Sequence, residues 1–167
     1  MLMIDTECIG FVTQIGACYF NDKGEIEEKF LINISMESCI KHGLQIDAKE
    51  LRWWLERDKP DWLKDSIDIR CALGRFREFC KRDVLVWSHN YDMYKLQIMY
   101  GAIGERIPFP YRNWRDIRTL VWLAGLNSKK EEDVTHNALD DAIRQVDYVS
   151  KCLEVVREKT KIVKIGV

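Results

Sequence analysis

The sequence predicts an α/β fold in which helices flank a mixed β-sheet of three antiparallel strands followed by a parallel one. Three β-rich segments come first, within residues 1–33, and the turn signal at residues 21–24 joins the last two as a hairpin. Helical patterns fill most of the remaining chain, and a short apolar run at residues 84–87 is typical of a buried strand. Strands followed by helices in this order predict one sheet covered by helices.

Local patterns justify the individual elements. Residues 12–20 are β-rich and largely apolar, and residues 25–33 alternate between apolar and charged side chains. Asp47 and Asp116 are of a type that caps the start of a helix, and Gly125 is of the type that ends one. The predicted helices cover residues 48–57, 67–81, 92–100, 117–124 and 138–158, with a further short helix from Pro60. The predicted loops cover residues 34–43, 101–114 and 127–133.

Length and composition predict a single domain over residues 1–167 with a hydrophobic core of its own. The formal net charge is −1, so no global basic field marks a nucleic-acid-binding protein, and such binding would need a local patch. No apolar run approaches the roughly 20 residues of a membrane span, so we expect neither a span nor a signal peptide. The six cysteines form no C-x-x-C pair, which predicts reduced thiols and a cytoplasmic protein.

Two acidic residues mark the first strand. Asp5 and Glu7 are two positions apart, so in a strand both carboxylates emerge on the same face. Two neighbouring acids on a core strand repel each other and lose hydration, and a hard cation such as Mg²⁺ or Mn²⁺ would remove that cost. The alternative interpretation is an exposed edge strand with two solvated acids.

Two further acids lie at the starts of predicted helices. Asp92 follows the apolar strand by a short turn, which places it near the carboxyl end of the strand, where open α/β sheets carry their sites. The alternative is a first-turn acid that the helix dipole stabilises. Asn137 can cap the last helix and Asp140 can complete the cap, whereas Asp141 lies beside Ala142 on the apolar stripe. A half-buried Asp141 requires a partner from elsewhere in the fold.

His136 precedes the last helix, and we expect it to be accessible and mobile there. The ordinary pKa of histidine, about 6.5, suits a general base near neutral pH. The alternative interpretation is a surface histidine in a loop.

In this order, these residues resemble the DEDDh 3′-5′ exonucleases, which include proofreading exonucleases and several RNases. The resemblance rests on Asp-x-Glu in the first strand, an aspartate after the fourth, and His-x-x-x-x-Asp at the last helix. The motif residues in this sequence are Asp5, Glu7, Asp92, His136 and Asp141. The segments 14–17, 43–55 and 111–120 are similar to the small phage and bacterial exonucleases of the RNase AS-like type.

The resemblance implies a ribonuclease H-like fold and two divalent cations, Mg²⁺ or Mn²⁺, that clamp the attacking and leaving oxygens of a phosphodiester. It implies that Asp5 bridges both ions, that Glu7 and Asp141 complete the site of the attacking water, and that Asp92 supports the second ion. His136 would take a proton from that water. The product would be a nucleoside 5′-monophosphate released from a 3′ end. RNase AS-like proteins also include dimers, so a homodimer is one expected state.

Substrate contacts are expected from aromatic and basic side chains, because single strands are held by stacking and by basic grooves. The candidates are Tyr91, Trp54, Trp114, Arg112 and Arg115. Adjacent Trp53 and Trp54 cannot both face the core of one helix, so one of them is expected to be partly exposed. The alternative for each tryptophan is core packing.

The charged loop at residues 129–133 precedes His136. It is interpreted as a solvated loop, with a lid that carries the histidine to the site as the alternative.

The leading functional prediction is a metal-dependent 3′-5′ exonuclease on single-stranded RNA. Single-stranded DNA is the alternative substrate, because the groups that would read the 2′-hydroxyl cannot be placed from the sequence. An alternative from another class is a non-catalytic module that binds nucleic acid with the same fold.

Overall fold

The computed structural model describes residues 1–57, 61–126 and 136–163. In this part of the chain five strands form one sheet, in the order β3-β2-β1-β4-β5. The strands are β1 (Leu2–Cys8), β2 (Val12–Phe20), β3 (Ile26–Asn33), β4 (Val86–Ser88) and β5 (Trp114–Asp116). The first three pair antiparallel, whereas β4 and β5 run parallel to β1. The predicted mixed sheet is therefore confirmed, and its centre is β1.

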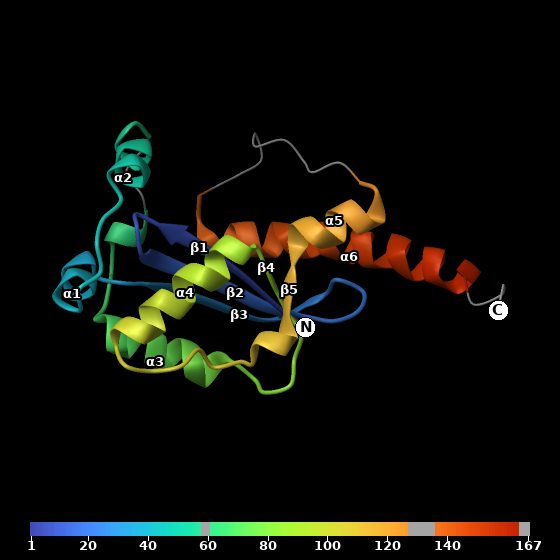
Figure 1. Ribbon diagram of the computed structural model, residues 1–167, viewed down its shortest axis with the longest axis horizontal. Coiled ribbons are helices and arrows are strands. Elements are labelled where there is room, and N and C mark those ends of the chain that lie inside the picture. Colours follow the sequence, from blue (N-terminus) through green and yellow to red (C-terminus); the bar gives the residue numbers. More distant parts are fainter. Residues whose placement is uncertain (58–60, 127–135, 164–167) are drawn as a thin grey trace.

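Helices cover both faces of the sheet (Figure 1). The α-helices are α1 (Met36–Lys41), α2 (Ala48–Leu55), α3 (Ile69–Phe79), α4 (Asn90–Ala102), α5 (Ile117–Ala124) and α6 (Ala138–Val163). Two short 3₁₀ helices, η1 (Asp61–Leu63) and η2 (Tyr111–Asn113), lie between them. The side chains of Asp47 and Asp116 accept hydrogen bonds from the backbone at the starts of α2 and α5, as the capping pattern predicts.

Two short elements differ from the sequence prediction. The predicted loop at residues 34–43 contains α1, which Ser35 caps through its hydroxyl. The end of the predicted loop at residues 101–114 contributes Trp114 to β5. Both elements are too short for a periodic pattern, and β5 exists because it pairs with β4. Pro60 and the predicted loop at residues 127–133 lie outside the described residues.

The sheet separates two hydrophobic clusters. Leu2 and Ile4 of β1 pack with residues of α3 and α4 on one face. Met3, which points the other way, packs with residues of α5 and α6. The alternation of β1 thus assigns each of its residues to one of the two faces, and Asp5 and Glu7 share the side of Met3.

The cysteines that the structure describes are free thiols, as their scattered positions predict. Within the described ranges, no helix combines the length and the apolar character that crossing a membrane requires.

Candidate active site

Asp5 and Glu7 lie on the central strand of the sheet. β1 is flanked by β2 on one side and β4 on the other, so the alternative of a solvated edge strand is wrong. The two side chains are each only 9% exposed. Two carboxylates are therefore held side by side in a buried position, on the face of the sheet that α6 covers.

A close approach between β2 and the start of α6 brings Asp141 to these carboxylates. Gly16 pairs with Asp5 across the sheet, and a Cβ atom on it would lie 2.1 Å from the carbonyl carbon of Ala138. The side-chain oxygen of Gln14 accepts a hydrogen bond of 2.8 Å from the backbone N–H of Ala138. These two contacts fix the first turn of α6 against β2, and Asp141 is buried as a result.

Asp92 reaches the same end of the sheet from the α4 side. Its carboxylate accepts hydrogen bonds from the hydroxyl of Thr6, at 2.7 Å, and from the hydroxyl of Ser88, at 2.9 Å. The backbone N–H of His89 donates a third bond of 3.2 Å. Thr6 points to the opposite face from Asp5 and Glu7, so it fixes Asp92 beside β1 across the strand.

His136 lies directly beside two of the acids. Ligand atoms of Glu7, His136 and Asp141 all lie within 4.8 Å of one another. The backbone of His136 has a φ of 55°, in the left-handed region, and its N–H donates to a carboxylate oxygen of Asp141 at 3.2 Å. The imidazole lies edge-on to the indoles of Trp53 and Trp54, with ring centroids 4.6 and 5.8 Å away. The imidazole is thus half-buried against α2, and the mobility of His136 stays a prediction.

Burial and mutual repulsion govern the ionisation of the acids. Burial raises the pKa of Asp5 well above its ordinary value, and the negative charges of Asp92 and Glu7 raise it further. Burial, followed by repulsion from Asp141 and Asp92, raises the pKa of Glu7 to about 8. Burial also raises the pKa of Asp92, although its hydrogen bonds oppose this shift. The site thus holds protons more tightly than isolated carboxylates do.

This donor set fits divalent cations. Carboxylate oxygens are the ligands that Mg²⁺ and Mn²⁺ prefer, and four of them meet here in a largely buried position. Positive charge would remove the repulsion that raises the pKa values of Asp5 and Glu7.

Two residues of the site were not identified from the sequence. Gln145 donates a hydrogen bond of 2.7 Å from Nε2 to Oδ1 of Asp5, while its Oε1 is buried without a hydrogen-bond partner among the described residues. Arg144 forms an ion pair of 2.9 Å with Asp141. Both lie within one turn of Asp141 on α6, so helical spacing was the available signal.

The expected substrate contacts occupy different surroundings. Trp54 is buried, and its indole N–H donates to the carbonyl oxygen of Cys8 at 3.0 Å, so its main environment is the core. Tyr91 is 46% exposed at the start of α4, where its hydroxyl donates to Glu50. Arg112 and Arg115 are exposed.

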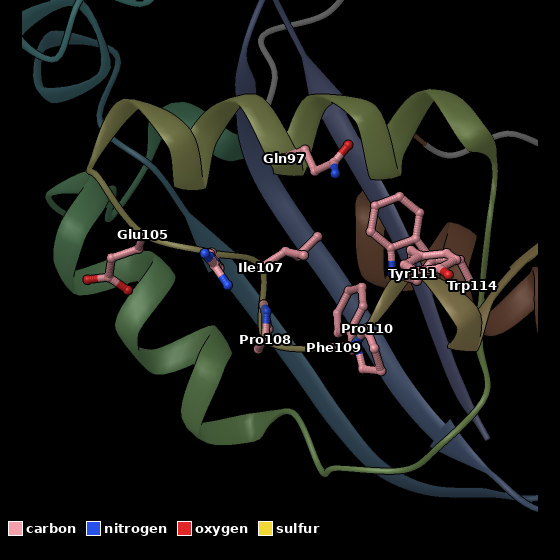
Figure 2. Close-up of a pocket in the computed structure, with 9 residues that line it drawn as sticks. Gln97, Glu105, Ile107, Pro108, Phe109, Pro110, Tyr111 and Trp114 are labelled. Carbon is pink, nitrogen blue, oxygen red and sulfur yellow. The ribbon is translucent and has the colours of Figure 1, made fainter.

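Trp114 lies further from the acids. Its side chain packs against the cluster on the α3 and α4 face, whereas Asp5 and Glu7 lie on the other face of the sheet. It lines a pocket with segment 105–111 (Figure 2). Residues 129–133, interpreted as a solvated loop with a lid as the alternative, lie outside the described residues.

Comparison with known proteins identifies the family. A family model described as the 3′-5′ exoribonuclease Rv2179c-like domain matches residues 1–153. A search of curated proteins gives no significant match. The matched segment contains every acid of the site, His136 and the sheet that carries them. The chain therefore belongs to the Rv2179c-like family of 3′-5′ exoribonuclease domains, which are hydrolases with a ribonuclease H-like fold.

Proposed function

We propose that this protein is a metal-dependent 3′-5′ exonuclease that removes nucleoside 5′-monophosphates from single-stranded RNA. The observation that carries the proposal is the convergence of four buried carboxylates with one histidine at the end of a central strand. Family membership supports RNA as the substrate and implies divalent metal ions. We also propose that residues 1–167 form one domain.

The acids would hold the cations. Asp5, Glu7, Asp92 and Asp141 would together hold two ions, and the repulsion that Asp5 receives from the other three acids supports its place within this set. When bound, such ions supply positive charge to the phosphate oxygens and to the attacking and leaving oxygens. The rigid surroundings support this role, because β2 fixes α6 through Gln14 and three hydrogen bonds fix Asp92.

The reaction is a hydrolysis in which one bond forms and one breaks. A water oxygen forms a bond to the phosphorus of the terminal phosphodiester, and the bond from phosphorus to the 3′ oxygen of the preceding nucleotide breaks. His136 accepts the proton that the water loses. The preceding nucleotide gains a proton on its 3′ oxygen, and the terminal nucleotide leaves as a 5′-monophosphate. The ring contacts with Trp53 and Trp54 hold the imidazole at the edge of the acidic cluster for this transfer.

Matched RNA and DNA oligonucleotides with a 5′ label test the proposal. With Mg²⁺ or Mn²⁺ we expect RNA to shorten stepwise from its 3′ end, and faster than DNA of the same sequence. Asp5→Asn should abolish cleavage, because a carboxylate that would hold the ions is lost. His136→Ala should reduce the rate by at least about a hundredfold while metal binding remains.

The outcomes separate the alternatives. Faster cleavage of DNA would make DNA the substrate. Metal and RNA binding without cleavage of either strand would favour a binding module. A His136→Ala variant with the full wild-type rate would contradict the general-base role. Light scattering of the wild-type protein tests separately whether it forms the homodimer that the resemblance implies as one expected state.

A further inference from the structure

Exposed aromatic side chains lead away from the acidic cluster along α4. Tyr91 and Tyr94 are 46% and 60% exposed, and Ile98 is 37% exposed. Their spacings of three and four residues place them along one face of the helix. This stripe begins next to Asp92, at the end of α4 that contributes to the acidic cluster. Tyr91 is tied to Glu50 through its hydroxyl, whereas core packing does not account for the exposed ring of Tyr94.

The α4 helix also lines a pocket, which Figure 2 shows. Gln97 lies one turn from Tyr94 and lines this pocket of about 540 Å³. Pro110, Tyr111 and Trp114 line it from the other side, and Tyr111 is 83% exposed. We call the surface formed by Tyr94, Gln97, Tyr111 and Trp114 the aromatic track.

Positive charge accompanies the aromatic track. Arg106 lines the pocket and is exposed, and Arg112 is exposed in η2, next to Tyr111. The acidic side chain in the pocket, Glu105, forms an ion pair of 2.6 Å with Arg77, which offsets its charge. Aromatic faces combined with arginines are the features that hold single-stranded nucleic acid without sequence readout.

We propose that the aromatic track binds the upstream nucleotides of the single-stranded RNA whose 3′ end occupies the acidic cluster. Bases would stack on Tyr94 and Tyr111, and Arg106 and Arg112 would contact the phosphates. The proposal rests on the exonuclease function proposed above. Charge complementarity favours a substrate strand over a second copy of the chain, because the exposed guanidinium groups of Arg106 and Arg112 match phosphates and the exposed tyrosines offer flat faces to bases.

Length dependence follows from the position of the track. Trp114 pairs at the level of Val86 on β4, whereas Asp92 contacts Ser88 at the end of that strand. The pocket also lies on the opposite face of the sheet from Asp5 and Glu7. We therefore expect a dinucleotide to leave the track unfilled and longer strands to fill it.

A length series of 5′-labelled RNA from two to ten nucleotides tests the proposal. For the wild type, we expect kcat/KM to rise with length and to level off once the track is filled. For Tyr94→Ala combined with Tyr111→Ala, the ratio of kcat/KM on the decamer to that on the dinucleotide should fall at least about tenfold. Tyr94→Phe keeps the aromatic ring and should therefore retain most of the wild-type ratio. Trp122→Ala removes a 77% exposed indole from α5, away from the track, and should leave the ratio unchanged.

Other outcomes would overturn the proposal. An unchanged ratio in the double variant would show that the track does not hold the strand. The aromatic track would instead be an interface between copies of the chain under two conditions. The wild type would be a dimer and the double variant a monomer, and kcat/KM would fall by the same factor for every RNA length. If the wild type cleaves no RNA, the proposed function fails. In that case, fluorescence anisotropy of the labelled decamer without metal tests the aromatic track by itself. The proposal predicts that the double variant binds the decamer more weakly than the wild type does.

Discussion

The imidazole of His136 packs perpendicular to the indole of Trp53, with 4.6 Å between ring centroids and 86° between ring planes. Trp53 is itself covered by the guanidinium of Arg57, which lies 3.5 Å from the centre of the indole. The α2 helix that carries Trp53 is fixed by Glu50, which accepts a hydrogen bond from the backbone of Gly10 and pairs with Lys95 at 3.3 Å. The position of the proposed general base therefore depends on a helix remote from it in sequence.

Replacing Trp53 should lower kcat more than it lowers the affinity for metal ions. We expect Trp53→Leu to lower kcat by about tenfold or more, because the imidazole loses the surface that orients it, while the affinity for Mn²⁺ stays the same. Trp53→Phe keeps an aromatic edge contact and should recover part of the rate. Steady-state kinetics and a metal titration measure these effects, with Trp122→Leu as the control. An unchanged kcat in Trp53→Leu would refute the positioning role.

Replacing Gln145 should weaken metal binding. Its amide donates to Asp5 at 2.7 Å and so orients one of the carboxylates proposed to hold the ions. Residues that orient a metal ligand typically contribute 10–100-fold to affinity, so we expect Gln145→Leu to weaken Mn²⁺ binding by about this factor. Isothermal titration calorimetry measures it, and Gln45→Leu at an exposed position serves as the control. Equal affinities in both variants would contradict this prediction.

A methyl group on Gly16 should disrupt the contact between β2 and α6. Its Cβ would lie 2.1 Å from the backbone of Ala138 and Leu139, which the rigid turn cannot accommodate. We expect Gly16→Ala to lower the free energy of unfolding by roughly 2 kcal/mol and to reduce activity through displacement of Asp141.

The matched control for this change is Gly74→Ala, at a helical position in α3 where an added Cβ meets nothing within 4 Å. This variant should be more stable by roughly 0.5–1 kcal/mol, because alanine restricts the unfolded chain. Denaturant unfolding of both variants measures the contrast. If Gly16→Ala is as stable as the wild type, the close approach does not fix α6.

The metal-free protein should lose stability as pH rises. Burial and the nearby acids raise the pKa of Glu7 from 4.5 to about 8, so the folded state holds this proton more tightly than the unfolded chain. The unfolded chain releases it near pH 4.5, and the contribution of Glu7 to the free energy of unfolding therefore falls between pH 4.5 and 8.

Denaturant unfolding in the presence of a chelator, at pH 5 and pH 8, tests this sign. We expect the wild type to lose at least about 1 kcal/mol relative to Glu7→Gln over this interval. Adding Mn²⁺ at pH 8 should restore the stability of the wild type more than that of the variant. Parallel pH dependences of the two proteins would contradict the pKa shift of Glu7.

The sequence predicts most of the fold because its strands and long helices carry clear periodicity. From the sequence, alternation in β1 predicts that Asp5 and Glu7 share one face, and the apolar stripe of α6 predicts that Asp141 points inward. The structure confirms both placements. β5 could not be predicted, because a three-residue strand exists only through its pairing with β4. For the same reason the sequence did not show which face of the sheet Trp114 occupies.

Contacts between remote segments account for the rest of the site. The packing of α2 on His136 depends on the network of Glu50, Gly10 and Lys95, which no local pattern encodes. Gln145, one turn after Asp141, could have been predicted from helical spacing, since it shares the inward face of α6. Its bond to Asp5, however, depends on how closely α6 approaches the sheet at Gly16.

Hydrolysis in ¹⁸O-labelled water, with Mn²⁺ and a short single-stranded RNA, tests the central claim most directly. If water attacks the terminal phosphodiester as proposed, mass spectrometry will find one ¹⁸O atom in the 5′-phosphate of each released mononucleotide, and an unlabelled 3′-hydroxyl on the shortened strand. A labelled 3′-phosphate on the strand, or an unlabelled cyclic phosphate, would contradict the account.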